Sequence, residues 1–535
     1  MSAVLTAADL AGGDVVYLLT LTFAGRPWRW ASRAVEVETE AGELLVFAGG
    51  LEGVDVEDAL EMGSSDVPSP RSASFTLDWP EVPALVEQGH DLASTTGELA
   101  AWVPGTTWER RLPLLDGLVP DAEYGDASEG VSLSLEERPF EVKAEIIPAE
   151  HMVNGITWPD AADEAEGQPY PLVFGTPGPY TTADGAASKA GATPGLVVHG
   201  SADTLLIAGH PTKAGADGDQ VDVNNKNLQT WASFTATHAA VDGDGRIVTT
   251  IDYTAEATWE PTHAYAVSWK SSAGIARADG EGYCSTAGDV LVLMLQRSRA
   301  RVDWGRVYAA KWRFDELTVG GFVDDGDPLD WVIDNLLPLF PDVCLTSGPG
   351  GIYPWVDRPV TSRDVVAELV DGQEGVTRTS GVSYVGYDEV VNLATLSYAY
   401  GLQRAAYQRS RTITGDPTRQ SLAGGVIVTH DARVSRARYG NRAVSLDGSD
   451  ILYDQASADA VLSRLVAVRG RARRALTLGA PFTWAWLQKG DAVSVTVDAL
   501  SMSARLGRVR AVHWQDDGVG FEVLLDPRAT PTTGG

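Results

Sequence analysis

Residues 434–446 read VSRARYGNRAVSL, and residues 477–527 of the same segment read TLGAPFTWAWLQKGDAVSVTVDALSMSARLGRVRAVHWQDDGVGFEVLLDP. The first part alternates as a strand does from Arg438 to Leu446, with a break at Gly440. The second part predicts a strand over 492–497, after a turn at 489–491. Two more strands are predicted over 505–514 and 519–525, joined by a turn at 516–518, so this part is predicted to be a β meander.

A helix is predicted between the two quoted parts. Ser457 is a favourable N-cap residue, and the apolar side chains that follow recur with the spacing of one helical stripe: Val461, Leu462, Leu465 and Val468. The whole segment is therefore predicted to fold as a strand, a helix and a β meander.

Upstream of this segment, strand patterns dominate. A β barrel or sandwich is predicted for the first 145 residues, with strands over 15–23, 28–31, 34–39, 43–48, 73–79, 99–103, 110–118 and 131–135 and a short helix within 81–92. A connector rich in Pro and Gly follows, and then a small all-β module with strands over 205–208, 231–236, 246–253 and 264–271.

The pattern becomes mixed from residue 289. Residues 290–295 start a helix or a strand, and Asp327-Pro328 open an amphipathic helix. A second short helix is predicted over 361–370, followed by strands over 381–386 and 390–400.

Composition excludes several classes of protein. The 535 residues exceed one ordinary domain, and 44% hydrophobic against 21% charged residues allows several packed cores. A formal charge of -32 argues against gripping nucleic acid. Residues 1–21 contain no Lys or Arg and no apolar run is long enough to span a membrane, so we expect synthesis and folding in a cytoplasm.

Charge is unevenly distributed along the chain. Residues 35–61 contain nine acidic side chains, whereas residues 401–480 contain thirteen Arg and six Asp. This asymmetry predicts contact between copies or with other proteins, and ordinary solvated faces are the alternative.

Five motifs carry a resemblance to a known family. They are GQPYPLVFG at 167–175, VVNLATLSYAY at 390–400, RALTL at 474–478, W-L-x-x-G-D-x-V-x-V-T at 486–496 and G-R-V-x-x-V at 507–512. In this order, over residues 10–527, the chain resembles the tail-tip or baseplate hub proteins of long-tailed bacteriophages and of phage-like gene transfer particles. In that family the hub is a trimeric ring at the end of the tail tube.

The resemblance implies a mainly β chain with a few helices (α+β) and several domains, in which two tail-tube-like β-barrel regions accompany an all-β insertion. We expect an N-terminal tube-like β hub domain (1–147), a connector (148–195), a β-rich insertion (196–290), a mixed α/β middle hub domain (291–433) and a C-terminal β-helix-β module (434–535). It also implies a structural virion protein at the distal end of the tail.

The implied partners are other copies in a homotrimer, the distal tail or tail tube protein, the tape-measure protein and a tail fibre or spike protein. DNA would pass during ejection without sequence-specific binding. The motif residues carried over are Tyr170, Pro171, Phe174, Gly175, Tyr439, Gly440, Trp486, Gly490 and Asp491, each with a structural role in turns or packing.

No sequence pattern predicts an enzyme, a metal site or a cofactor. The eight histidines never recur at i, i+4, and signatures of zinc proteases, serine hydrolases and phosphate loops are missing. His199 and His210 bracket a strand, and Cys284 would need a neighbouring His to act as a nucleophile, so packing or surface roles are preferred. Asp217, Asp219, Asp222 and Asn224 could surround calcium, but without the terminal Glu of an EF-hand a solvated loop is preferred.

Tryptophan is abundant, with sixteen residues, many of them beside predicted strands. Trp484, Trp486 and Trp514 are candidate interface aromatics, and the first two share a face if 483–487 is extended. Two other functions stay open: a receptor- or glycan-binding tail-tip protein that uses the insertion, and a cell-wall hydrolase.

Overall fold

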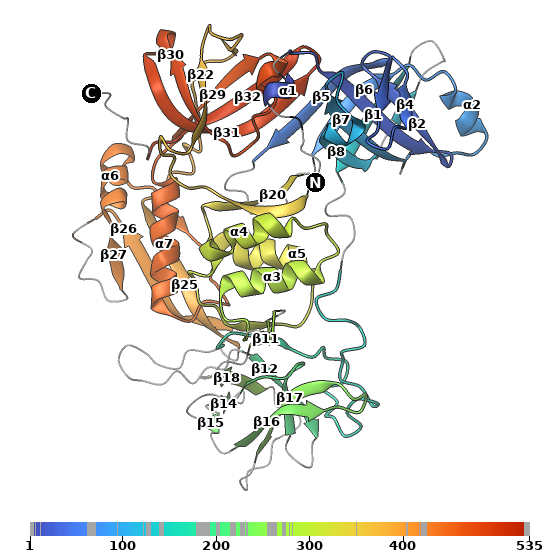
Figure 1. Cartoon of the computed structure of the whole chain (residues 1–535). Helices are drawn as coiled ribbons and strands as arrows, with labels where there is room; N and C mark the ends of the chain where they lie inside the picture. Colours follow the sequence, from blue (N-terminus) through green and yellow to red (C-terminus); the bar gives the residue numbers. More distant parts are fainter. Residues whose placement is uncertain are drawn as a thin grey trace.

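The computed structural model describes residues 5, 7–10, 12–60, 71–93, 95–120, 122–124, 130–137, 144–177, 193–199, 204–213, 221–224, 230–231, 234–253, 265–269, 274–277, 279–280, 282–348, 350–402, 405–416, 418 and 425–528. The expectation of a mainly β, multidomain chain with a few helices is confirmed. Among the described helices, none has the length and apolar character needed to cross a membrane. Figure 1 shows a large curled sheet at the top, a helical region below it and a second sheet at the bottom.

The N-terminal half of the large sheet comes from strands that are close together in sequence. These strands are β1 (Val16–Phe23), β2 (Arg26–Ala31), β5 (Leu51–Ala59), β6 (Ser72–Leu77), β7 (Thr96–Trp102), β8 (Leu112–Leu118), β9 (Ala122–Tyr124) and β10 (Val131–Glu137). Their spatial order is β2-β1-β7-β8-β10-β6-β5, with β9 paired to β10. The period-two pattern turns every second side chain inward, as with Ala73, Phe75 and Leu77 of β6.

Smaller elements flank this half of the sheet. Helix α1 (Ala7–Leu10) precedes β1, helix α2 (Val82–Glu87) follows β6, and β3 (Val35–Glu38) pairs with β4 (Leu44–Phe47) in a separate hairpin. The predicted hairpin and the short helix within 81–92 are thus confirmed, whereas β5 was not predicted.

The C-terminal half of the sheet collects strands from two distant parts of the chain. These are β22 (Val365–Val370), β23 (Thr377–Arg378), β24 (Ser383–Val385), β29 (Arg473–Ala480), β30 (Ala492–Val497), β31 (Met502–Gln515) and β32 (Gly518–Leu525). The predicted meander is confirmed, because β31 pairs antiparallel with both β30 and β32.

The helix predicted over 361–370 is wrong. Thr361 does bond to Asp364 as in a capping box, because the backbone N–H of Thr361 donates to Asp364 Oδ2 at 2.9 Å. The residues that follow, however, form β22, which pairs in parallel with β30 and buries Ala367 and Leu369 while Val366 and Glu368 stay exposed. This alternation belongs to a strand, and the tertiary pairing overrides the local cap signal.

The two halves are joined into one sheet of fifteen strands by the antiparallel pairing of β5 with β31. Three further hydrogen bonds cross the junction: Tyr17 Oη donates to the carbonyl of Gln515 (2.7 Å), and the N–H groups of Val54 and Leu60 donate to Asp516 Oδ1 (3.1 Å) and the carbonyl of Arg510 (2.8 Å). One hydrophobic core also contains residues of both halves, including Phe75 and Phe521. The halves are therefore one packed unit.

A middle body of helices and short strands lies below this sheet (Figure 1). It contains α3 (Ala287–Arg297), α4 (Trp304–Phe314), α5 (Pro328–Trp331), α6 (His430–Tyr439), α7 (Gln455–Arg469), β11 (Leu172–Phe174), β19 (Gly321–Val323), β20 (Val343–Gly348), β21 (Gly351–Val356), β25 (Leu393–Gly401), β26 (Ala406–Thr414), β27 (Val426–Val428) and β28 (Ala443–Ser445). Its core draws on residues from 146 to 466, so α7 packs here and not on the strands that follow it in sequence.

Local signals explain how the helices of the middle body begin. Asp327 caps α5 by accepting hydrogen bonds from the N–H groups of Leu329 (2.8 Å) and Asp330 (3.2 Å), as its sequence predicts. Residues 290–295, for which the sequence left helix or strand open, belong to helix α3. Thr286 and Asp289 form a capping box at the start of this helix.

Two predictions in the segment 434–469 are wrong. Arg438 and Tyr439 end helix α6, which Thr429 caps and Gly440 terminates with φ +71°, so only 443–445 of the predicted strand is β. Helix α7 is capped by Asp454, whose carboxylate accepts the N–H of Ser457 at 2.8 Å; Ser457 itself lies inside the helix. Asp454 is the stronger cap because its carboxylate is charged and lies three residues before the bonded N–H.

The insertion forms a separate antiparallel sheet of seven strands, in the order β15-β14-β18-β12-β13-β17-β16. The strands are β12 (Thr193–His199), β13 (Thr204–Ala208), β14 (Val221–Asn224), β15 (Thr230–Trp231), β16 (Phe234–Val241), β17 (Ile247–Tyr253) and β18 (Tyr265–Trp269). Part of the connector covers this sheet, since Val153, Ala165 and Tyr170 share a core with Val198 and Leu206.

Candidate functional site

The motif residues of 170–175 stand where the insertion joins the middle body. Tyr170 is 1% exposed, and its hydroxyl donates to Asp242 Oδ2 (2.8 Å) while it accepts from Trp158 Nε1 (3.1 Å). Burial raises the pKa of Tyr170 to about 12, so the hydroxyl keeps its proton for this bond. The carbonyl of Pro171 accepts the N–H of Gly209 at 2.8 Å. These contacts fix the connector on the insertion sheet.

The next two motif residues face the middle body. Phe174 is fully buried and meets Trp331 edge-on, with ring centroids 5.8 Å apart. Gly175 has φ +63°, and a Cβ at this position would lie 1.8 Å from the carbonyl oxygen of Val319. Only glycine fits both the backbone conformation and this close approach.

The motif residues near the C-terminus occupy turns and ring contacts. Tyr439 meets Tyr387 edge-on at 6.0 Å, and Gly440 ends α6. Gly490 has φ +90°, and a Cβ there would lie 2.4 Å from Trp355 Nε1 of the middle body. Asp491 Oδ2 accepts the N–H of Gln488 at 2.9 Å, and burial raises the pKa of the Asp491 carboxyl.

The three candidate interface aromatics have different environments. Residues 482–484 form a 3₁₀ turn, so the extended conformation considered for 483–487 is wrong; Trp484 and Trp486 nevertheless stack, with centroids 6.4 Å apart, and both are half-buried. Trp514 is 5% exposed and lies in the shared core beside the β5–β31 junction.

The residues considered for chemistry make ordinary packing and polar contacts. His199 Nε2 lies 3.3 Å from Asp160, whereas His210 Nε2 accepts the N–H of Val173 at 3.0 Å. Burial lowers the pKa of His210 to about 4 and raises the pKa of the Cys284 thiol to about 12, so the first stays neutral and the second stays protonated.

The described residues contain no group of three or more His, Cys, Asp or Glu that could hold a metal ion. Of the calcium candidates, 217 and 219 lie outside the described residues, as do the side chains of 222 and 224.

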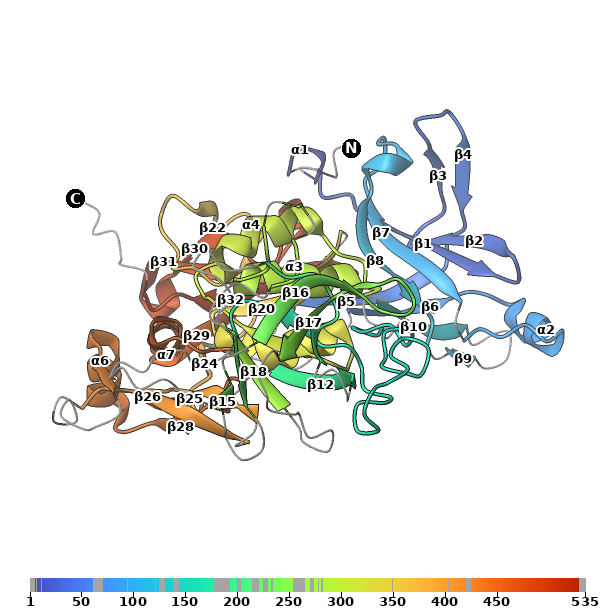
Figure 2. The ribbon, with the colours of Figure 1, turned by 90° about the horizontal axis from the view of Figure 1, so that it is seen from below.

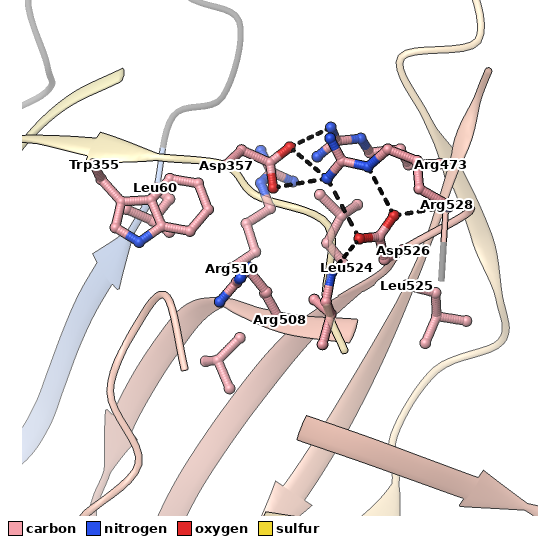
Figure 3. Close-up of a pocket in the computed structure, with 12 residues that line it drawn as sticks. Leu60, Trp355, Asp357, Arg473, Arg508, Arg510, Leu524, Leu525, Asp526 and Arg528 are labelled. Carbon is pink, nitrogen blue, oxygen red and sulfur yellow. Dashed lines mark hydrogen bonds and ion pairs between the residues drawn. The ribbon is translucent and has the colours of Figure 1, made fainter. Parts of the chain in front are cut away.

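A pocket lined by several ion-paired side chains lies where the N-terminal half, the middle body and the C-terminal half meet (Figure 3). Leu60 follows β5, Trp355 and Asp357 belong to β21 and the segment after it, and Arg508 and Arg528 come from β31 and the segment after β32. Asp357 binds the guanidinium groups of Arg473 and, at 3.2 Å, Arg528. This buried carboxylate therefore connects the segment that follows β21 of the middle body to two segments of the C-terminal half.

A second carboxylate completes this network. Asp526 accepts the N–H of Val360 at 2.8 Å and the Nε–H of Arg528 at 3.0 Å. Burial alone would raise the pKa of Asp526, but the hydrogen bond and charge of Arg528 outweigh it and hold that pKa below its usual range. Asp526 is thus ionised and paired with Arg528, and Asp357 forms ion pairs with Arg473 and Arg528.

Two other ion pairs lie where the parts of the molecule meet. Glu137 binds Arg71 in bidentate fashion (2.6 and 2.9 Å) and accepts the Ser347 hydroxyl of β20 at 2.6 Å. Lys489, whose side chain is 4% exposed, pairs with Asp58 of β5. These residues were not identified from the sequence, because partners such as Glu137 and Ser347 are 210 residues apart and no spacing links them.

Comparison with known proteins gives distant structural likenesses. No family model and no curated protein matches the chain. A 43 kDa tail protein of prophage MuSo2 from Shewanella oneidensis matches with a TM-score of 0.34 and 9% identity, over 95% of this chain and 98% of that chain. A chain in the p2 virion baseplate in activated conformation matches with a TM-score of 0.25 and 7% identity, over 96% of this chain and 100% of that chain.

A chain of the virion of a native gene transfer agent particle matches with a TM-score of 0.20 and 11% identity, over 49% of this chain and 82% of that chain. These three solved structures are a tail protein, a baseplate chain and a gene transfer agent chain.

Proposed function

We propose that the chain is a structural protein of a phage-type virion and forms a trimeric hub at the distal end of the tail tube. The observation that carries this proposal is the single sheet of fifteen strands, whose two curled halves come from opposite ends of the sequence. The sequence motifs that resemble hub proteins lie on the same framework, since 474–478 and 507–512 belong to β29 and β31.

Rigidity is the property that such a role requires. In a ring, each subunit contacts its neighbours at fixed positions. A subunit whose two halves could change their relative orientation would not keep these contacts in place. The β5–β31 pairing, the Lys489–Asp58 pair and the Asp357 network hold the three bodies together by backbone and charged contacts. In this proposal, two curled half-barrels per chain supply the wall of the ring.

The charge of the chain suits the channel that the proposal includes. At -32 the surface repels phosphate, so DNA and the tape-measure protein would pass without the wall retaining DNA. The same hub would contact the distal tail or tail tube protein on one side and a fibre or spike protein on the other.

The test is the mass of the purified chain by light scattering, followed by negative-stain class averages of the same sample. We expect a particle of three times 56.8 kDa with an open centre. Co-assembly with a tube-end protein extends the test to the tail itself. A chain that is monomeric alone and also fails to form a ring with a tube-end protein contradicts the hub.

One structural feature supports a receptor-binding role as the second candidate. The seven-stranded insertion sheet lies at the end of the molecule farthest from the large sheet (Figure 1). Glycan-array binding by the full chain would favour the receptor role, whereas the hub proposal expects no binding. Clearing of peptidoglycan in a zymogram would indicate the hydrolase instead.

A further inference from the structure

The β3–β4 hairpin presents an acidic and apolar outer face. In its register, Glu36 lies opposite Val46 and Glu38 opposite Leu44. Residues between them, Val37, Leu45 and Phe47, turn inward and form a small core with Val16 and Trp102. The four outward residues are exposed, with Leu44 at 54% and Val46 at 60%. Two carboxylates thus flank two exposed aliphatic side chains on one flat face.

A groove of the C-terminal half has the complementary character. Four arginines, Arg438, Arg471, Arg474 and Arg505, line it together with Tyr384, which is 61% exposed. Among the described residues that line it, the one acidic side chain is Asp526, which Arg528 already neutralises. Arg474 and Arg505 are half-buried and form no ion pair within the part of the chain that the structure describes. Partly desolvated guanidinium groups without a carboxylate are costly, so the groove favours an acidic occupant.

These two surfaces lie at opposite ends of the molecule. In both Figure 1 and Figure 2, the strands of the N-terminal half lie at one end, while α6, which carries Arg438, and β30, whose Val495 pairs with Arg505, lie toward the other. A hairpin therefore cannot reach the groove of its own chain. Surfaces that are complementary and face away from each other are what a head-to-tail contact between identical subunits requires.

We propose that the β3–β4 hairpin of one copy docks in the arginine groove of the next copy. This inference rests on the trimer of the proposed function and names one contact that closes it. Glu36 and Glu38 would pair with Arg474 and Arg505, while Leu44 and Val46 would cover the exposed ring of Tyr384. The mixed character of both surfaces combines charge pairs with apolar burial in one contact.

Other occupants of the groove fit less well. Nucleic acid would supply negative charge and could stack a base on the ring of Tyr384, but the net charge of -32 repels its phosphates. Residues 529–535 follow the groove in sequence and contain no acidic side chain. A second copy supplies both the carboxylates and the apolar surface.

The experiment reverses the charges on each side and then on both sides. A hairpin variant carries Glu36→Arg and Glu38→Arg, a groove variant carries Arg474→Glu and Arg505→Glu, and a swap variant carries all four changes. Analytical ultracentrifugation measures the assembly state of each full-length chain. Each one-sided variant is expected to weaken self-association about 100-fold, because like charges then face each other. The swap variant is expected to recover the trimer.

Mixing the two one-sided variants sharpens the test. A hairpin variant and a groove variant match each other in both directions, but two copies of the same variant repel. A closed ring of three must contain one such repulsive contact, so the mixture is expected to stop at one-to-one pairs. Because Glu36 and Glu38 are exposed, the hairpin variant is expected to fold normally, which circular dichroism checks.

The outcomes separate this contact from the ring itself. A wild-type trimer that is insensitive to both reversals, or a swap variant that stays dissociated, overturns the docking but leaves the hub proposal standing. A wild-type chain that is monomeric alone and with a tube-end protein contradicts both. Binding of duplex DNA by the wild type that the groove variant loses would assign the groove to nucleic acid.

Discussion

The two halves of the large sheet look alike but are assembled by different means. In the N-terminal half the strands between Val16 and Glu137 follow one another in sequence and pair antiparallel. In the C-terminal half, β22 pairs in parallel with β30, and between them the chain forms α6, α7 and β25–β28 of the middle body. One half is thus built from a single continuous stretch of chain, although it includes non-consecutive pairs such as β1 with β7, whereas the other half depends on segments from more distant parts of the sequence meeting. Stability of the second half should therefore depend more on contacts across bodies.

The largest expected effect tests whether the halves unfold together. Phe521 of β32 and Phe75 of β6 are 0% and 3% exposed in one shared core. Each Phe→Ala change is expected to lower the free energy of unfolding by about 3–5 kcal/mol, because it removes buried surface and leaves a cavity. Both should shift the same transition in urea, followed by tryptophan fluorescence.

Two separate transitions, each shifted by only one of the substitutions, would show that the two halves unfold independently. Ile156→Ala, at a position that is 74% exposed, is the control. Its expected effect is within about 0.5 kcal/mol.

The ion pair between Lys489 and Asp58 tests the link between the halves. Burial lowers the pKa of Lys489, which Asp58 opposes only in part. Lys489→Met is expected to cost about 3 kcal/mol, because it leaves the carboxylate of Asp58, whose side chain is 25% exposed, without its partner. The double variant Lys489→Met, Asp58→Leu should restore most of that loss, since two apolar groups can replace a buried pair. Urea unfolding of the single and double variants measures both; equal losses would mean that the pair is not coupled.

Two glycines with similar backbone angles allow the cost of backbone strain to be distinguished from the cost of a steric clash. Gly490 in the C-terminal half and Gly42 in the β3–β4 hairpin have φ of +90° and +80°. A Cβ at Gly490 meets Trp355 at 2.4 Å, whereas a Cβ at Gly42 meets nothing within 4 Å. Gly490→Ala is expected to cost about 2–4 kcal/mol against about 1 kcal/mol for Gly42→Ala. Similar shifts of the thermal midpoint for both variants would show that the side chain of Trp355 moves aside without lowering the stability.

The smallest expected effect concerns the contact of the middle body with the N-terminal half. Burial alone would raise the pKa of Glu137, but the hydrogen bond and charge of Arg71 and the hydroxyl of Ser347 hold it below its usual 4.5. Its stabilising share is therefore present above that pH and is lost as pH falls through the folded pKa. Ser347→Ala should cost about 1 kcal/mol at neutral pH and move the loss on acidification to higher pH.

Unfolding free energies measured from neutral pH down to about pH 3 follow this change. Ser74→Ala, on the exposed face of β6, is the matched control and should leave the acid profile as in the wild type. An unchanged profile in Ser347→Ala would show that the hydroxyl does not act on Glu137.

Sequence patterns predicted the elements whose signals are local. The meander β30–β32 alternates with period two between clear turns, and Asp327-Pro328 is a complete helix start, so both were predicted. Strand β22 was not, since Thr361 and Asp364 form a real cap-like bond while the pairing with β30 comes from the tertiary structure. The buried ion pairs could not be predicted, because Arg473 and Asp357 are 116 residues apart and neither belongs to a motif.

The pairing of β5 with β31 also has a consequence for biosynthesis. The N–H of Val54 donates to Asp516, which lies 462 residues later in the sequence. The edge of β5 that pairs with β31 therefore has no partner while the ribosome synthesises the middle of the chain. An open edge invites pairing with another nascent chain. Strand β5 carries Glu52, Asp55, Glu57 and Asp58, so two such edges repel each other. The negative charge of β5 thus disfavours aggregation of nascent chains until β31 has been synthesised.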